Sequence, residues 1–253
     1  MSRGPRAAMA ERKVGDEPGF RWRGHDVSRI EGFSDAVFAF ALTLLVVALE
    51  VPKTYDELMD TMRGFFAFSA CFAVLYKLWW SHYSFFRRYG LADGFVIVWN
   101  AVLLFLVMFF IYPLKFLFTG MFNVLFLHLG LVSGDTEERL KAIVVASFQG
   151  ADVQILMCVY GAGFLMVSLV FALLYRHALQ RADFLGLDAV ERHMTVDEIQ
   201  GHLLDGGVAV FSIGIVLVGG KEWAAPAGWS YMLLGPVRAW HGTRRSKSCP
   251  KPG

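Results

Sequence analysis

Catalytic and cofactor-binding motifs are missing from this sequence. It contains no glycine-rich phosphate loop, no HExxH zinc motif and no GxSxG nucleophile motif. The three cysteines stand apart in the chain and lack metal-ligand spacing: Cys71, Cys158 and Cys249. We therefore expect no enzyme activity, no organic cofactor, no disulfide and no zinc site.

A secretory signal and a large net charge are also missing. Residues 1–28 are polar and charged, and they contain no apolar run followed by a small-residue cleavage site. The net charge of +2 gives no reason to expect nucleic acid as a partner. Residues 1–28 therefore predict a cytoplasmic N-terminal arm that is disordered.

Apolar residues are abundant instead. They make up 56% of the chain and include 23 Phe and 7 Trp, an excess that is typical of membrane proteins and not of soluble ones. A helix needs about 20 apolar residues to cross a bilayer. We expect an all-α polytopic membrane protein with six transmembrane helices, near residues 29–52, 58–86, 94–118, 151–175, 203–219 and 223–240. The apolar stretch Met121 to Val132 is too short to cross and predicts an outer-surface or re-entrant piece.

The distribution of positive charge predicts the topology. Lys and Arg gather in the N-terminal arm, at Arg87 and Arg88, after Tyr175 and in the tail from Arg238 onward, so every second loop is basic. Both termini are then cytoplasmic, and the protein is an integral protein of the cell membrane. The chain divides into the arm (1–28), a six-span transmembrane domain (29–240) and a basic cytoplasmic tail (241–253).

A polar signature opens the first predicted span. Arg29, Phe33, Ser34 and Asp35 lead directly into an uncharged apolar run. Arg and Asp cost about 3 kcal/mol at the centre of a membrane helix, so they stay there only when paired or when they serve a pathway. In the alternative interpretation, Ser34 or Asp35 caps the helix and Arg29 binds lipid phosphate.

The apolar run that follows carries one hydroxyl group on a regular stripe. Ala36, Phe40, Thr43 and Val47 are spaced by four, three and four residues, which places them on one helix face. A helix that lines a pore would have such a face. The alternative is ordinary packing, with the Thr43 hydroxyl bonded to a carbonyl one turn earlier.

These motifs resemble one known family. The signature from Arg29 to Asp35 and the apolar run after it are similar to the RxxxFSD first helix of the transmembrane protein 175 family of potassium-permeable channels. Trp79 and His82 in the second span, and Asn100 and Pro113 in the third, are similar to the same family's pattern. The resemblance covers roughly residues 28 to 240 and indicates the single-repeat form.

The resemblance implies a homotetramer with the first helices around a shared axis. Rings of Phe40, Thr43 and Val47 would form a narrow apolar constriction, with Thr43 oxygens in contact with potassium ions, and protons are a second ion that the family allows. The family leads us to expect Ile or Leu at position 40 and Leu at position 47, so the Phe40 ring could occlude the path. The resemblance also implies a polar network of the signature residues with His82.

Two other functions stay open. In one, the protein is a proton pathway or a secondary transporter in which Asp35 and His82 titrate. In the other, it is a membrane scaffold that conducts nothing. Few acidic residues lie inside the predicted spans, which argues against a proton pump with a relay of carboxylates.

Overall fold

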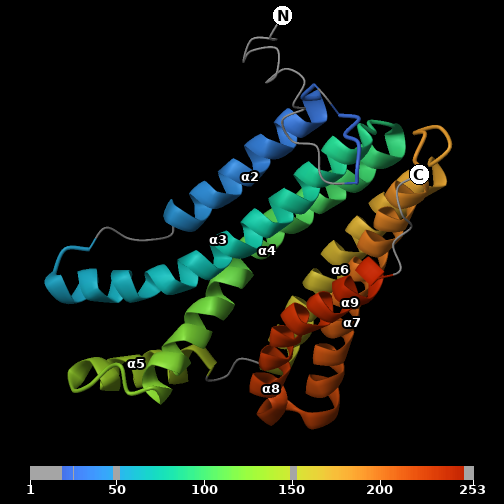
Figure 1. Cartoon of the computed structure of the whole chain (residues 1–253). Coiled ribbons are helices and arrows are strands. Elements are labelled where there is room, and N and C mark those ends of the chain that lie inside the picture. Colours follow the sequence, from blue (N-terminus) through green and yellow to red (C-terminus); the bar gives the residue numbers. More distant parts are fainter. Residues whose placement is uncertain (1–18, 25, 48–51, 149–152, 248–253) are drawn as a thin grey trace, which may run out of the picture.

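The protein was examined as a computed structural model that describes residues 19–24, 26–47, 52–148 and 153–247. Every regular element in these ranges is helical (Figure 1). The elements are α2 (Arg29–Val47), α3 (Tyr55–Tyr89), α4 (Gly94–His128), α5 (Asp135–Phe148), α6 (Val153–Gln180), α7 (Ala189–Gly219), the 3-10 helix η1 (Lys221–Trp223), α8 (Ala224–Trp229), the 3-10 helix η2 (Ser230–Leu233) and α9 (Leu234–Lys247). The all-α class predicted from the sequence is confirmed.

Four of these helices are long and apolar enough to cross a membrane: α3, α4, α6 and α7. They contain the second to fifth predicted spans. The first and sixth predicted spans correspond to α2 and to the region from η1 to α9, which are not among the four. The count of six spans therefore stays a prediction.

Local sequence explains where the long helices begin. The side chain of Thr54 accepts a hydrogen bond from the Glu57 amide at the start of α3, and Asp93 accepts one from the Val96 amide at the start of α4. Gly90 ends α3 in the left-handed conformation, with φ of 59°. The turn between α3 and α4 is thus defined by a glycine stop and an aspartate start.

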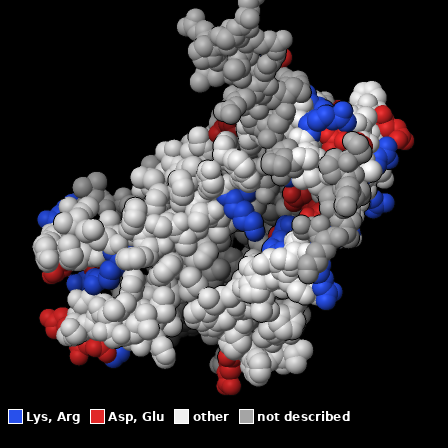
Figure 2. All heavy atoms as spheres, viewed as in Figure 1, with Lys and Arg blue, Asp and Glu red and all other residues white. Residues whose placement is uncertain are grey.

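The helices run back and forth, and the described ends of the chain lie together. The start of α2, the turn between α3 and α4, the turn between α6 and α7 and the end of α9 share one end of the bundle (Figure 1). We call this the termini end. In Figure 2, charged side chains gather toward this end and along the opposite edge, and uncharged surface covers much of the region between them. This arrangement is typical of a helical membrane protein.

Apolar clusters join the helices: one packs α6 against α7 and α8, and two others join α2, α3, α4 and α6. The larger of these two packs α3 and α4 against α6, with Phe85, Leu103, Phe171 and Tyr175 fully buried. The smaller one packs α2 against α3 and α4: Phe38, Ala41, Leu45, Cys71, Leu75, Leu104, Val107 and Ile111. The α2 residues of the smaller cluster all lie on the same face of that helix.

The segment Met121 to Val132 differs from the prediction. Its first part continues α4 as far as His128, so it is not a separate surface or re-entrant piece. The helix also passes through Pro113, whose carbonyl oxygen accepts a hydrogen bond from the Tyr160 hydroxyl of α6. A hydroxyl of the neighbouring helix thus bonds to α4 directly at the proline.

The last predicted span also differs. Residues 221–247 form four short consecutive helical pieces and not one helix from 223 to 240. Pro226, Gly228, Gly235 and Pro236 explain the breaks, since both residue types disfavour a helix interior. The predicted tail from 241 to 253 is helical as far as Lys247, and the rest of it lies outside the described residues.

Candidate functional site

Helix α2 begins with a reciprocal pair of hydrogen bonds. The Glu31 amide donates to the Ser28 hydroxyl over 3.2 Å, and the Ser28 amide donates to the Glu31 carboxylate over 3.0 Å. This is a capping box. The alternative in which Ser34 or Asp35 caps this helix is therefore wrong, although the S-x-x-E spacing of the true cap was present in the sequence.

A buried polar cluster connects α2 to α3 and α4. The Asn100 amide donates to the Ser34 hydroxyl over 2.9 Å, and its side-chain oxygen lies 2.9 Å from His82 Nε2. Ser34 in turn donates to the Ile30 carbonyl over 2.8 Å. The three side chains are at most 2% exposed. Because buried polar groups are costly without partners, the cluster specifies how the three helices meet.

The other signature residues lie beside this cluster and not in it. Asp35 is exposed, and its carboxylate accepts a hydrogen bond from the Trp79 indole over 2.8 Å. Arg29 and Phe33 are also exposed. Of the predicted network, the structure brings together Ser34 and His82, through Asn100. Asp35 reaches α3 separately.

The opposite face of α2 is uncovered in the single chain. Phe33, Phe40 and Val46 are 64%, 55% and 51% exposed, and Thr43 on the same side is exposed as well. The Thr43 hydroxyl donates to the Ala39 carbonyl over 2.9 Å, the local bond that the packing alternative predicted. That bond leaves the hydroxyl oxygen able to accept from, or contact, a further group. The side chain of Val47 lies outside the described residues.

The sequence did not predict two charged pairs that join different helices. Arg87 of α3 binds Glu31 of α2 over 3.2 Å. In α7, Asp205 is 4% exposed and accepts two hydrogen bonds from Arg238 of α9, of 3.0 and 2.7 Å. A sequence gives no direct signal for such pairs, because the partners are far apart along the chain.

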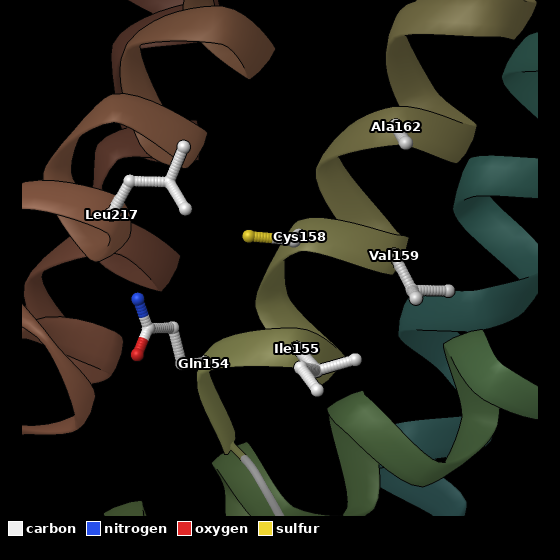
Figure 3. Close-up of a pocket in the computed structure, with 6 residues that line it drawn as sticks. All are labelled: Gln154, Ile155, Cys158, Val159, Ala162 and Leu217. Carbon is white, nitrogen blue, oxygen red and sulfur yellow. The ribbon is translucent and has the colours of Figure 1, made fainter.

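A groove and the arrangement of potential metal ligands complete the description of possible sites. A groove of about 530 Å³ lies between α6 and α7 (Figure 3), with this lining: Gln154, Ile155, Cys158, Val159, Ala162 and Leu217. Among the described residues its lining is mostly apolar, with Gln154 the one amide. Within the described ranges, no group of three or more His, Cys, Asp or Glu side chains could hold a metal ion.

A family model and two related proteins that match this chain are all described as potassium channels. The family model described as the endosomal/lysosomal potassium channel TMEM175 matches residues 29–113, which contain α2, the polar cluster and α4 up to Pro113. A protein of Marivirga tractuosa named as a potassium channel is 36% identical over 240 residues, 94% of this chain and 95% of that protein. A potassium channel of Chamaesiphon minutus is 30% identical over 176 residues, which are 66% of this chain and 73% of that protein.

Solved structures agree with these relatives. A variant of the potassium channel MtTMEM175, crystallised with a nanobody–MBP fusion protein, superposes with a TM-score of 0.79 at 33% identity and covers 92% of this chain and 100% of that one. A TMEM175 homologue of Chamaesiphon minutus shares the fold, with a TM-score of 0.53 at 22% identity over 86% of this chain and 96% of that one. The resemblance inferred from the RxxxFSD signature is confirmed. The chain is a membrane protein that belongs to the TMEM175 family of potassium channels.

Proposed function

We propose that this protein conducts potassium ions along a path between several copies of the chain, lined by the exposed face of α2. The observation that carries the proposal is that face itself: Phe40 and Thr43 are exposed on a helix whose other side is fully packed. The named potassium-channel relative that spans nearly the whole chain supports the same function. Lipid would cover a purely apolar face equally well. The hydroxyl of Thr43 is therefore the feature of this face that favours an ion path over contact with lipid.

The proposed assembly is a homotetramer in the cell membrane with six spans in each chain. The termini end would be cytoplasmic, in agreement with the basic residues of its loops. In the tetramer, rings of Phe40 and Val47 would form a hydrophobic constriction, and Thr43 oxygens would contact the ion. Such a path needs several copies, because the apolar run of one α2 offers a single hydroxyl group, that of Thr43, on this face.

The polar cluster would have a structural role in this channel. Ser34, His82 and Asn100 are buried away from the exposed face and satisfy one another's hydrogen bonds. They would hold α2 at a fixed rotation, so that Phe40 and Thr43 face the path. The same burial argues against the alternative in which His82 exchanges protons with water.

The test is potassium flux into liposomes that contain the purified protein. We expect Phe40→Ile to increase the flux several-fold over the wild type, because a smaller side chain widens the constriction. The matched control is Phe105→Ile, since Phe105 of α4 is 68% exposed and has no place in the proposed path. Flux in neither the wild type nor Phe40→Ile would refute potassium conduction and leave the scaffold alternative.

Two further measurements separate the alternatives. Crosslinking of the membrane-embedded protein should give species up to the tetramer, and monomers alone would exclude a shared path. A flux driven by a pH gradient that Asp35→Asn abolishes, in protein that still assembles, would favour the transporter alternative. We expect Asp35→Asn to retain potassium flux.

A further inference from the structure

The residues just before α2 cross the termini end of the bundle and are firmly attached there. We call residues 19–24 the N-terminal strap. The sequence predicts disorder for this part of the arm, yet Phe20 is 2% exposed and packs edge-on against Tyr89, with ring centroids 5.5 Å apart. The guanidinium of Arg88 lies 5.3 Å from the Phe20 ring. The strap is thus part of the folded core at this end.

A buried carboxylate on α7 holds the strap. The Glu191 side chain is fully buried and receives hydrogen bonds from two guanidiniums, with Arg23 Nη2 at 2.7 Å and Arg21 Nε at 3.3 Å. The Arg21 amide donates to the same carboxylate over 2.9 Å. Arg23 also donates to the carbonyl of Leu185, in the turn between α6 and α7, over 2.7 Å. Charge-assisted bonds of this kind fix geometry strongly when they are buried.

The strap is bonded on its other side to α3 and, through α3, to α2. The amides of Arg23 and Gly24 donate to the Arg87 carbonyl over 3.0 and 3.1 Å, and the Arg87 guanidinium donates back to the Gly24 carbonyl over 2.8 Å. The same guanidinium binds Glu31, in the first turn of α2, over 3.2 Å. A continuous series of contacts therefore runs from Glu191 through Arg23 and Arg87 to Glu31.

The crossing of strap and helix leaves no room for a larger residue. A Cβ atom on Gly24 would lie 2.5 Å from the Phe86 carbonyl oxygen, which is backbone and cannot rotate away. A Cβ on Gly32 of α2 would meet nothing within 4 Å. Gly24→Ala should therefore displace the strap without changing any charge. Gly32→Ala is the matched control.

We infer that the strap positions the start of the proposed pore helix, and that Glu191 is a positioning residue for conduction although it lies on α7. Glu31 is buried at the N-terminus of α2, where its charge is favourable, and its place is set by Arg87 and so by the strap. A shift of the strap would change the rotation or tilt of α2 and thus the constriction. The inference rests on the proposed function for its effect on ion flux, but not for its effect on α2.

The experiment uses Glu191→Gln and Gly24→Ala in the full-length protein. Gln keeps the shape of Glu191 and can still cap α7, but it loses the charge that binds two arginines. The controls are Asp183→Asn, which removes a carboxylate of the same turn that pairs only with Arg192 at the surface, and Gly32→Ala. Both variants should speed up tryptic cleavage after the strap arginines several-fold, and both controls should leave it unchanged.

The position of α2 is then measured directly. Spin labels at Phe33→Cys on α2 and Val210→Cys on α7, in a background without the native cysteines and diluted with unlabelled chain, report one distance within each copy. Both variants should broaden or shift this distance and change potassium flux several-fold. Glu31→Gln combined with Glu191→Gln should be no worse than the stronger single change, because both interrupt the same series of contacts.

The outcomes separate the two proposals. Faster tryptic cleavage with an unchanged distance and unchanged flux would overturn the inference, because the strap would then only anchor the arm. Unchanged cleavage in both variants would overturn it as well. A changed distance with no flux in any protein, wild type included, would support the positioning of α2 and refute the proposed function.

Discussion

Helices α3 and α6 are both long enough to cross a membrane, yet their own chain buries them to different degrees. In the most apolar 18 residues of α6, 50% are buried inside the chain, against 17% in α3. Helix α6 packs tightly on its neighbours: a Cβ on Gly163 would lie 2.3 Å from the Phe110 ring, and one on Gly161 would lie 2.5 Å from Ile213. Both glycines thus allow a close approach between the helices.

Helices α2 and α3 differ from α6 and α7 in the surface that they leave exposed. An aromatic face of α3 is exposed next to the exposed face of α2, and it includes Phe65, Phe72, Tyr76 and Trp80. A larger share of α6 and α7 is therefore buried within one chain, although α7 also exposes Val218. We propose that the α6–α7 half contributes most of the stability of a single chain, and that the proposed assembly depends mainly on the α2–α3 half.

The largest expected effect is a loss of stability in the α6–α7 half, at a contact that α7 makes with α9. Arg238→Met should destabilise the protein by about 3–5 kcal/mol, because Asp205 would remain buried and charged without its partner. The measurement is the unfolding transition of the purified protein in detergent. We expect the loss in monomers and assembled protein alike.

The control for this change is the double variant. Asp205→Asn together with Arg238→Met removes both charges and should recover much of the lost stability. If Arg238→Met is as stable as the wild type, or if it only prevents assembly, the proposed division between the two halves is wrong.

A smaller effect is expected in the α2–α4 half. Asn100→Leu removes the side chain that joins Ser34 to His82, and it should cost about 1–3 kcal/mol because both remaining groups are buried. It should also change potassium flux, since α2 loses the contact that fixes its rotation. Asn123→Leu, on the same helix, is the control. Normal flux in an Asn100→Leu protein that is clearly destabilised would show that the cluster does not position α2.

The smallest effect depends on pH and lies in the turn between α3 and α4, where Asp93 contacts His177 of α6. Burial raises the pKa of Asp93, but hydrogen bonds from His177 and from the Val96 amide outweigh it and hold the pKa below its ordinary value of 3.8. Asp93 therefore stabilises the fold above pH 3.8, and this contribution is lost as the pH falls through its lowered pKa. Asp93→Asn keeps the helix cap but should lower the thermal transition slightly at pH 7. The difference from wild type should vanish in acid, and a constant difference at every pH would contradict this account.

The sequence was informative where one residue type or period decides the structure. Long apolar runs located α3, α4, α6 and α7, and the stripe through Phe40 and Thr43 identified the face of α2 that is exposed. Asn100 stood out as an amide in an apolar span, and it occupies the centre of the polar cluster. These signals are local, so a single sequence contains them.

The rest depended on contacts between distant segments. The breaks after Lys221 contradict the single span expected at 223–240, because Pro226 and Pro236 lie inside it. The strap residues are polar and charged, which is typical of disorder, and Arg21 and Arg23 become structural through contacts with distant residues, above all with the buried Glu191. A pairing over that distance along the chain leaves no periodic pattern to read.

The length of two helices has a consequence for access from outside the bilayer. Helices α3 and α4 have 35 residues each. At about 1.5 Å per residue such a helix measures about 50 Å, whereas the hydrocarbon layer is about 30 Å thick. Phe66 of α3 and Phe126 of α4 meet edge to face far from the termini end, with ring centroids 5.5 Å apart, so the two helices remain joined there. Each helix is thus about 20 Å longer than the hydrocarbon layer, so in an upright orientation its ends extend into the headgroup regions, where a large blocker such as an antibody can approach them without entering the hydrocarbon.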